Sequence, residues 1–184
     1  MSRPSKEEIT LPRDVEAIVI PQGHRTSLPG GTRVRVLQML GDAATVSADF
    51  GGLFRLGPES FDALGLDAPA APEPGAEDAR PLEDRVWDVL RSCYDPEIPV
   101  NIVELGLVYD CRVAEPAADG KRDVAIKMTL TAPGCGMGDV LAQDIEQKLG
   151  RLPEVGAAKV EVVFDPPWNQ NMMSEGARLQ LGFF

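Results

Sequence analysis

A single cysteine, Cys135, stands among three glycines and a proline in the stretch TAPGCGMGDV, residues 131–140. The stretch separates a predicted strand from a helix that we expect to begin near Met137 or Gly138. Unpaired backbone N–H groups at the amino terminus of a helix favour negative charge. We therefore expect the pKa of the Cys135 thiol to be lowered, which makes its sulfur a better nucleophile or metal ligand.

The residues around this cysteine suit a close approach to its sulfur. Gly134 and Gly136 would let a bulky group or a partner come near, and Thr131 opens the same loop. The competing interpretation is a tight strand-to-helix turn in which the cysteine is incidental. Cys135 continues no apolar stripe, and this favours the functional interpretation.

The sequence lacks the partner residues that several kinds of cysteine chemistry need. The only histidine, His24, lies in the other half of the chain within a polar turn, so Cys135 has no nearby histidine base. The sequence contains no CxxC pair for a thioredoxin-like cycle and no ligand spacing for a closed zinc site. A lone thiolate would have to share a labile iron or iron–sulfur site with a second copy, a carboxylate or a small thiol.

Carboxylates gather in the stretch DPEIPVNIVELGLVYD, at Asp95, Glu97, Glu104 and Asp110, with Asn101 between them. Two prolines restrict this loop and can hold polar groups in place. The simpler interpretation is a pair of turns with solvated acids and a capping aspartate. Asp95 and Glu104 become site candidates if the fold brings the loop beside the cysteine loop.

The last part of the chain, FDPPWNQNMMSEGARLQLGFF, places Trp168 after two prolines in a loop of amides and methionines. Exposed Trp and Met side chains often mark contact surfaces. A tryptophan folded over the edge of a sheet explains the pattern equally well, so both alternatives stay open.

The chain is expected to consist of two domains. Residues 67–81, DAPAAPEPGAEDARP, have the composition of a linker. Residues 1–66 carry short apolar runs between turn-like segments, which predicts a small all-β, barrel-like domain. Phe61 and Leu64 lie three residues apart and Gly65 follows, so one helical turn is predicted there.

Residues 82–184 have the pattern of an α+β domain. The first predicted helix begins at Pro81 and has one apolar stripe: Leu82, Val86, Leu90 and Cys93. A hairpin of LGLVYDCRV and DVAIKMTLT is expected next, with Asp119-Gly120 as its turn signal. A second helix ending at Gly150 and a strand KVEVVFD complete the order helix, strand, strand, helix, strand. This order predicts a two-layer α/β sandwich.

The other two cysteines are interpreted as core residues, because free cysteine is among the most buried residue types. Cys93 continues the stripe of the first helix. Cys111 is predicted to share one face of its strand with Leu107, Tyr109 and Val113.

Composition restricts the partners and the compartment. The formal net charge of −11 opposes binding to nucleic acid and to anionic membrane surfaces. No apolar run approaches the roughly 20 residues that cross a bilayer. Three widely spaced cysteines and a first stretch without an apolar signal core favour the reducing cytoplasm.

Three stretches taken in order, DPEIPVNIVELGLVYD, TAPGCGMGDVLAQDIEQKL and VEVVFDPPWNQNMMSEGARLQLG, resemble the metal–sulfur cluster biosynthetic domain family, in particular its SufT-type bacterial branch. The resemblance places the reactive cysteine of the family at Cys135 and its acidic loop at Asp95, Glu97 and Glu104. Gly136-Met137-Gly138 follows the cysteine where many members have proline, as the SufT-type branch tends to. Glu104 stands where aspartate is common.

The resemblance implies a non-enzymatic factor that helps deliver iron–sulfur clusters to apo-proteins. Iron or a cluster would be bound transiently through Cys135, so that the purified protein can lack it. The expected partners are the assembly machinery, apo client proteins and a second copy in a homodimer. The site is expected to include the acidic loop, the cysteine loop and the tryptophan: Asp95, Glu97, Asn101, Glu104, Thr131, Gly134, Gly136, Met137, Gly138 and Trp168. The alternative is a metal-free adaptor that docks the machinery onto clients. A thiol-dependent enzyme is the least favoured class.

Overall fold

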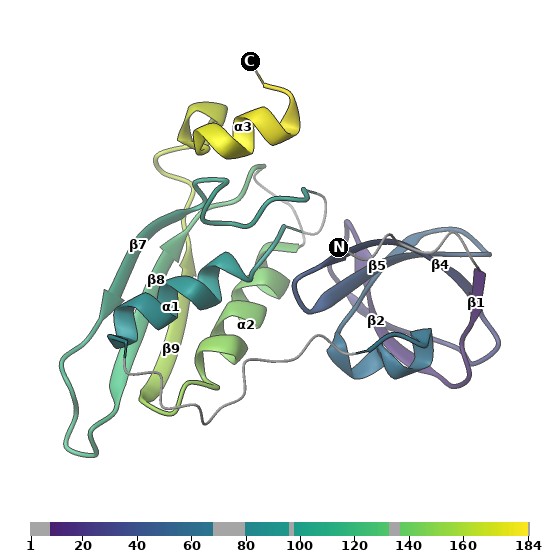
Figure 1. Cartoon of the computed structure of the whole chain (residues 1–184), viewed down its shortest axis with the longest axis horizontal. Helices are drawn as coiled ribbons and strands as arrows, with labels where there is room; N and C mark the ends of the chain where they lie inside the picture. The colour runs from purple at the N-terminus through teal and green to yellow at the C-terminus, as the bar shows by residue number, and fades with distance from the viewer. Residues whose placement is uncertain (1–7, 68–79, 96–97, 133–136, 184) are drawn as a thin grey trace. The chain divides into compact units, whose positions relative to one another are not determined.

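The computed structural model describes residues 8–67, 80–95, 98–132 and 137–183 (Figure 1). The chain divides into two compact units, residues 1–72 and 73–184. Each unit has its own cluster of buried apolar side chains. The predicted mixed α+β class is confirmed by two sheets and three α-helices among the described residues. The predicted linker falls mostly on residues 68–79, which lie outside the described part.

The first unit contains a six-stranded antiparallel sheet. Its strands pair in the order β1-β4-β5-β6-β2-β3. Their bounds are β1 (Glu8–Thr10), β2 (Val15–Ile20), β3 (Arg25–Leu28), β4 (Arg33–Leu40), β5 (Ala43–Ala48) and β6 (Leu53–Leu56). The described residues include no pairing between the edge strands β1 and β3, so closure into a barrel stays a prediction.

A helical segment follows the last strand of this sheet, as the sequence predicts, but it consists of two consecutive 3₁₀ turns. These are η1 (Pro58–Ser60) and η2 (Asp62–Leu64). Phe61 is fully buried in the core of the first unit. Gly65 ends the segment in the left-handed conformation that glycine adopts without strain.

The second unit places two helices on one face of a three-stranded sheet. The elements are α1 (Leu82–Arg91), β7 (Val108–Val113), β8 (Arg122–Met128), α2 (Met137–Leu149), β9 (Val155–Val162), η3 (Gln170–Met172) and α3 (Glu175–Leu181). Strand β8 pairs antiparallel with β7 and parallel with β9. The connection from β8 to β9 therefore crosses over through α2.

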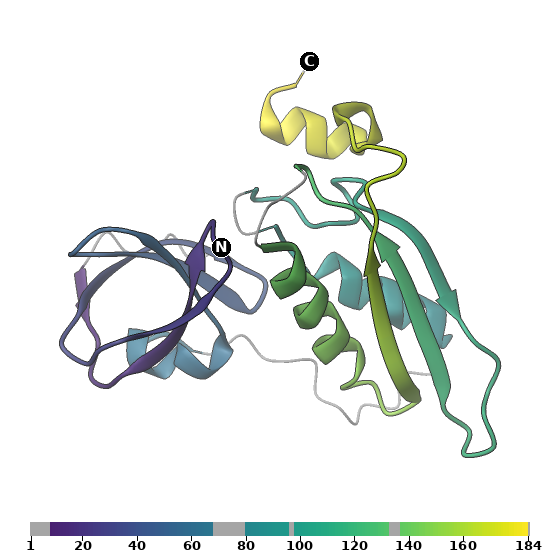
Figure 2. The same ribbon diagram turned by 180° about the vertical axis from the view of Figure 1, so that it is seen from behind.

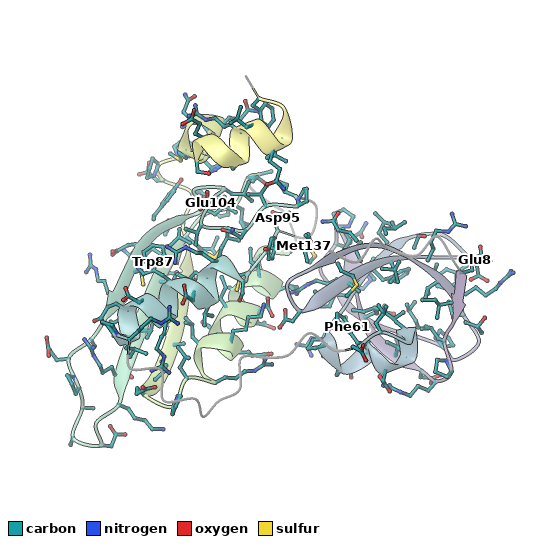
Figure 3. The ribbon with its side chains drawn as sticks, in the orientation of Figure 1. Glu8, Phe61, Trp87, Asp95, Glu104 and Met137 are labelled. Carbon is teal, nitrogen blue, oxygen red and sulfur yellow. The ribbon has the colours of Figure 1, made fainter. Side chains whose placement is uncertain are left out.

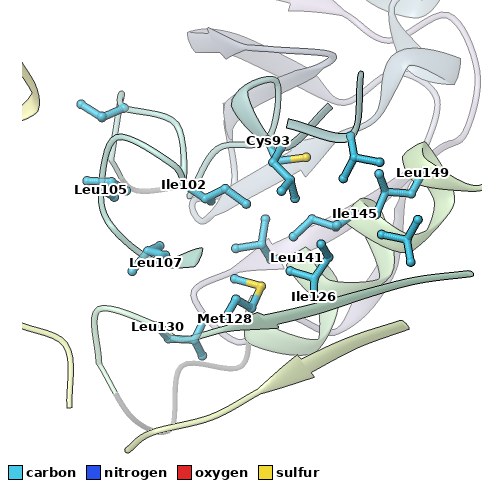
Figure 4. Close-up of a cluster of buried hydrophobic side chains, with 14 of the residues drawn as sticks. Cys93, Ile102, Leu105, Leu107, Ile126, Met128, Leu130, Leu141, Ile145 and Leu149 are labelled. Atoms are coloured by element: carbon cyan, nitrogen blue, oxygen red, sulfur yellow. The ribbon is translucent and has the colours of Figure 1, made fainter. Parts of the chain in front are cut away.

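The core of the second unit lies between the helices and the sheet (Figure 4). The predicted stripe of α1 is buried, although Pro81 precedes the helix as its cap instead of forming its first residue. Helix α2 begins at Met137 and buries Leu141, Ile145 and Leu149, as its spacing predicts. The last strand begins at Val155, four residues before the predicted stretch, and ends at Val162.

Of the neighbours predicted for Cys111, Leu107 and Val113 belong to or pack against the core, but Tyr109 does not. A β-bulge shifts the register between Val108 and Asp110, so that Tyr109 is the extra residue in β7. Beyond the bulge, Cys111 lies opposite the buried Ile126, while the hydroxyl of Tyr109 donates to the Pro166 carbonyl at 2.8 Å. One inserted residue therefore removes Tyr109 from the core-facing set.

Candidate functional site

The loop that carries the cysteine follows the carboxyl end of β8 and leads directly into α2. In parallel β-α-β connections, ligand sites commonly form at the carboxyl ends of the strands. Cys135, Gly134 and Gly136 lie outside the described residues. Thr131 is half-buried, and Met137 and Gly138 are buried in the first turn of α2.

Gly138 lets the start of α2 pack closely against the end of β8. A Cβ atom at this position would lie 2.6 Å from Leu130 Cδ1, well inside contact distance. The glycine therefore has a packing role that its place in the cysteine loop did not reveal. Its neighbour Met137 is 3% exposed, so this side chain belongs to the interior and presents no surface for a partner.

The acidic loop is held by its own backbone and by one amide side chain. Tyr94 and Asn101 form an isolated β-bridge across its base. The Asn101 Oδ1 atom accepts hydrogen bonds from the N–H groups of Val103 (3.1 Å) and Glu104 (2.9 Å). This asparagine therefore closes a turn, which is a common use of its side chain.

The carboxylates of this loop differ in their surroundings. Asp95 is only 8% exposed, so a partly desolvated carboxylate lies at the start of the loop. Glu104 is half-buried, and its carbonyl accepts a hydrogen bond of 2.8 Å from the N–H of Ser174. Glu97 lies outside the described residues. Figure 3 places Asp95, Glu104 and Met137 at the same end of the second unit.

The segment after β9 folds back onto the acidic loop. The indole of Trp168 is half-buried and donates to the Leu105 carbonyl at 2.9 Å. Gln180 Nε2 donates to the Pro99 carbonyl at 3.0 Å. Trp168 is therefore docked on the acidic loop and not over the edge of the sheet. No sequence pattern indicated that the two segments share hydrogen bonds, because the bonded residues lie 63 and 81 positions apart in the chain.

Gly106 is the point of closest approach between the two segments. Its φ of +71° belongs to the left-handed region, and a Cβ atom there would overlap the carbonyl group of Met172. Only glycine satisfies both conditions without strain. The acidic loop and the final segment, which we call the docked tail (residues 164–183), therefore form one packed body.

One buried polar atom at this end of the sheet has no partner in the described part of the chain. Thr129 is 1% exposed, and its Oγ1 atom makes no hydrogen bond to any described residue. Its backbone N–H donates to the Leu107 carbonyl at 2.8 Å, so the residue itself is firmly placed. An unsatisfied buried hydroxyl costs stability. Sequence reasoning missed this residue, because threonine is ordinary in a strand.

We predict that Thr129→Val stabilises the fold. Valine keeps the shape of the side chain and removes the unpaired hydroxyl, so the free energy of unfolding should rise by about 1 kcal/mol. Urea unfolding of the two proteins measures the difference. A loss of stability would show instead that the hydroxyl has a partner in the folded protein.

The two described cysteines are poor nucleophiles. Cys93 is fully buried. Cys111 is half-buried, and desolvation, reinforced by the negative charges of Asp110 and Glu83, raises the pKa of its thiol from 9.0 to about 11. A raised pKa disfavours the thiolate, which is the form that reacts and binds metal.

The pKa of Cys111 predicts its alkylation profile. At pH 8 its thiolate fraction should be about a hundredfold lower than that of an ordinary thiol, because each pKa unit is a factor of ten. Alkylation by iodoacetamide, followed by mass spectrometry of the Cys111 peptide, should keep accelerating as the pH rises past 9 towards 11. A rate that levels off near pH 9 would contradict the raised pKa. The guanidinium-unfolded chain is the reference.

The described residues contain no group of three His, Cys, Asp or Glu side chains that could hold a metal ion. Within the same residues, no helix is long and apolar enough to cross a membrane.

A family model described as "Iron-sulfur cluster assembly protein" matches residues 83–162, within the second unit. A "Fe-S protein maturation auxiliary factor" of Porphyromonas gingivalis is 45% identical over 101 residues, which are 55% of this chain and 91% of that protein. The "Fe-S protein maturation auxiliary factor SufT" of Staphylococcus aureus is 39% identical over 88 residues, 48% of this chain and 94% of that one.

Among solved structures, a domain of unknown function DUF59 from Bacillus anthracis is 36% identical. The match covers 56% of this chain and 93% of that one, with a TM-score of 0.50. The crossover of β8, α2 and β9, with a cysteine loop at its start, thus lies within the part of the chain that matches proteins of iron–sulfur assembly. The chain belongs to the iron–sulfur cluster assembly protein family.

Proposed function

We propose that this protein is a maturation factor that carries iron or an iron–sulfur cluster to apo-proteins, with the cluster as its cargo. The observation that carries the proposal is the family membership of the second unit, whose relatives are named Fe–S protein maturation auxiliary factors. That name describes an auxiliary role, which supports a factor without catalytic turnover. The partners would be the assembly machinery and client proteins, and the compartment would be the cytoplasm.

Cys135 is the ligand in this proposal. Of the three cysteines, Cys93 is buried in the core and the thiol of Cys111 is kept protonated by its raised pKa. Cys135 precedes the amino terminus of α2, where backbone N–H groups favour a thiolate. A single thiolate leaves the other coordination positions of the cargo to external ligands, and such weak ligation suits transfer.

The acidic loop and the docked tail would form the surface around the cargo. Asp95, Glu97 and Glu104 would provide carboxylates, and Thr131, Gly134, Gly136 and Gly138 would shape the approach to the sulfur. The other three residues would not contact the cargo but would hold the surface in shape. Asn101 closes a turn, Met137 is buried, and Trp168 docks the tail. Transfer would proceed by exchange of the Cys135 thiolate for thiolates of the client.

Cells that lack the native protein test this proposal when they are complemented with Cys135→Ser. Cluster occupancy of client enzymes, measured from iron content and activity, should fall to the level of the deletion strain. Cys111→Ser is the matched control and should restore occupancy, because its thiol is protonated at neutral pH. Normal occupancy with Cys135→Ser would refute the ligand role and leave the metal-free adaptor.

A further inference from the structure

The two edge strands of the sheet in the second unit, β9 and β7, differ in whether their outward-pointing backbone groups are hydrogen-bonded. Val163 directs its N–H to the Met128 carbonyl on β8. Along a strand, successive N–H groups point alternately to the two sides, so the N–H of Val160 points away from β8. The Oε1 atom of Glu146 on α2 accepts that N–H at 2.9 Å. The β9 edge is therefore partly capped by a side chain, which is one way to prevent edge pairing.

The opposite edge, β7, has no such cap among the described residues. Ala114 donates its N–H to the Asp123 carbonyl on β8 at 2.8 Å. In an antiparallel ladder, hydrogen-bonded and non-bonded residue pairs alternate. Arg112 is therefore also hydrogen-bonded to β8, whereas the N–H and carbonyl groups of Cys111 and Val113 point away from β8, towards the open edge. No hydrogen bond to these outward groups occurs in the described part of the chain. In Figures 1 and 2 no other described helix or strand of this unit lies beyond β7.

The charged side chains on the β7 edge would attract those of a second copy of the same edge. Asp110 and Arg112 flank Cys111 and lie on the solvent face, where Arg112 Nε is 2.7 Å from Asp110 Oδ2 and the Arg112 side chain is 77% exposed. If two β7 strands pair antiparallel about Cys111, Asp110 of each copy lies opposite Arg112 of the other. Opposite charges in cross-strand pairs are favourable. If the two strands paired about Arg112 instead of Cys111, the two Arg112 side chains would lie opposite each other.

We propose that the β7 edge is a homodimer interface, in which two copies pair antiparallel about Cys111 and join their sheets into one six-stranded sheet. The two Cys111 residues would exchange backbone hydrogen bonds, and two Asp110–Arg112 pairs would fix the register. This inference goes beyond the proposed function and does not depend on it, because the pairing involves no cargo.

Sedimentation equilibrium of the full chain tests the interface. The parent should dimerise reversibly as its concentration rises. Asp110→Arg and Arg112→Asp should each raise the dimer dissociation constant by about tenfold, because each places two like-charged pairs across the interface. The double variant Asp110→Arg/Arg112→Asp restores opposite pairs and should recover the parent value. Circular dichroism and urea unfolding confirm that each variant is folded.

Matched controls carry the same charge changes on β9. Glu161→Arg and Lys159→Asp alter exposed positions on the far edge strand and should leave the dissociation constant unchanged. A chain that stays monomeric at every concentration, or a dimer indifferent to the single reversals, would overturn the proposal. Iron uptake is a separate readout, so failure here leaves the proposed function intact.

Discussion

Cys135→Ser should abolish iron uptake when the purified protein is reconstituted anaerobically with iron and sulfide. Thiolate is the ligand that iron–sulfur clusters prefer, and a serine hydroxyl remains protonated at neutral pH. Loss of even an indirect ligand contact commonly costs ten- to a hundredfold in metal affinity, so loss of the only protein thiolate should cost at least about a hundredfold.

Visible spectra and metal analysis measure this result. The parent should gain sulfur-to-iron charge-transfer absorption, and Cys135→Ser should not. Cys111→Ser and Cys93→Ala serve as controls, and Cys111→Ser should keep the absorption because its thiol is protonated. Equal absorption in the parent and in Cys135→Ser would place the iron elsewhere. The oligomeric mass of the loaded protein, measured alongside, shows whether the cargo bridges two copies.

Gly106→Ala should cost about 3 kcal/mol of stability. Alanine at φ +71° costs roughly 1 to 2 kcal/mol in backbone strain. Its Cβ would also overlap the carbonyl group of Met172, which is backbone and cannot rotate away, so the docked tail must move. Displacement of the tail then breaks the hydrogen bond from Trp168 to Leu105, which adds to the loss.

Gly120→Ala is the matched control for this prediction. Gly120 has a similar φ of +79°, but a Cβ atom there would have no described atom within 4 Å beyond its chain neighbours, so it has the strain without the overlap. Urea unfolding should therefore show a larger loss for Gly106→Ala by roughly 1 to 2 kcal/mol. In a Trp87→Phe background, Trp168 fluorescence should also shift to the red in Gly106→Ala alone. Equal losses and unshifted fluorescence would show that the tail is not docked through this contact.

The sequence predicted elements whose signals are local. The stripes of α1 and α2 depend on residues three or four apart. The glycines at 65, 120 and 150 each bond within their own turns. Burial of Cys93 followed from the first stripe and is confirmed. These features could be predicted because each depends on a single short window of the chain.

Features that depend on distant contacts escaped prediction. The bulge at Tyr109 changes which residues of β7 face the core, and an alternating pattern does not reveal an inserted residue. The docked tail joins Leu105 to Trp168, which only tertiary packing brings together. Asn101 was grouped with the carboxylates by composition, whereas its side chain closes a turn.

The candidate site likewise combines residues that the sequence suggested with residues that only the tertiary structure revealed. Sequence reasoning selected Asp95 and Glu104 on the condition that their loop lies beside the cysteine loop. The structure places both residues at the end of the unit where α2 begins. It adds Gly106, through a close backbone approach, and Thr129, whose hydroxyl has no partner among the described residues. Cys135 itself lies outside the described residues, and its ligand role is a proposal to be tested.

Direct transfer to an acceptor tests the central claim. The reconstituted parent protein would be mixed anaerobically with an apo-ferredoxin that needs a [2Fe–2S] or [4Fe–4S] cluster, in the presence of a chelator that captures free iron. We predict that the acceptor gains its characteristic spectrum at a rate that rises with the concentration of the loaded protein, and that Cys135→Ser supports no such gain. Transfer that the chelator suppresses completely, or that proceeds equally with Cys135→Ser, would contradict a carrier that delivers its cargo through this cysteine.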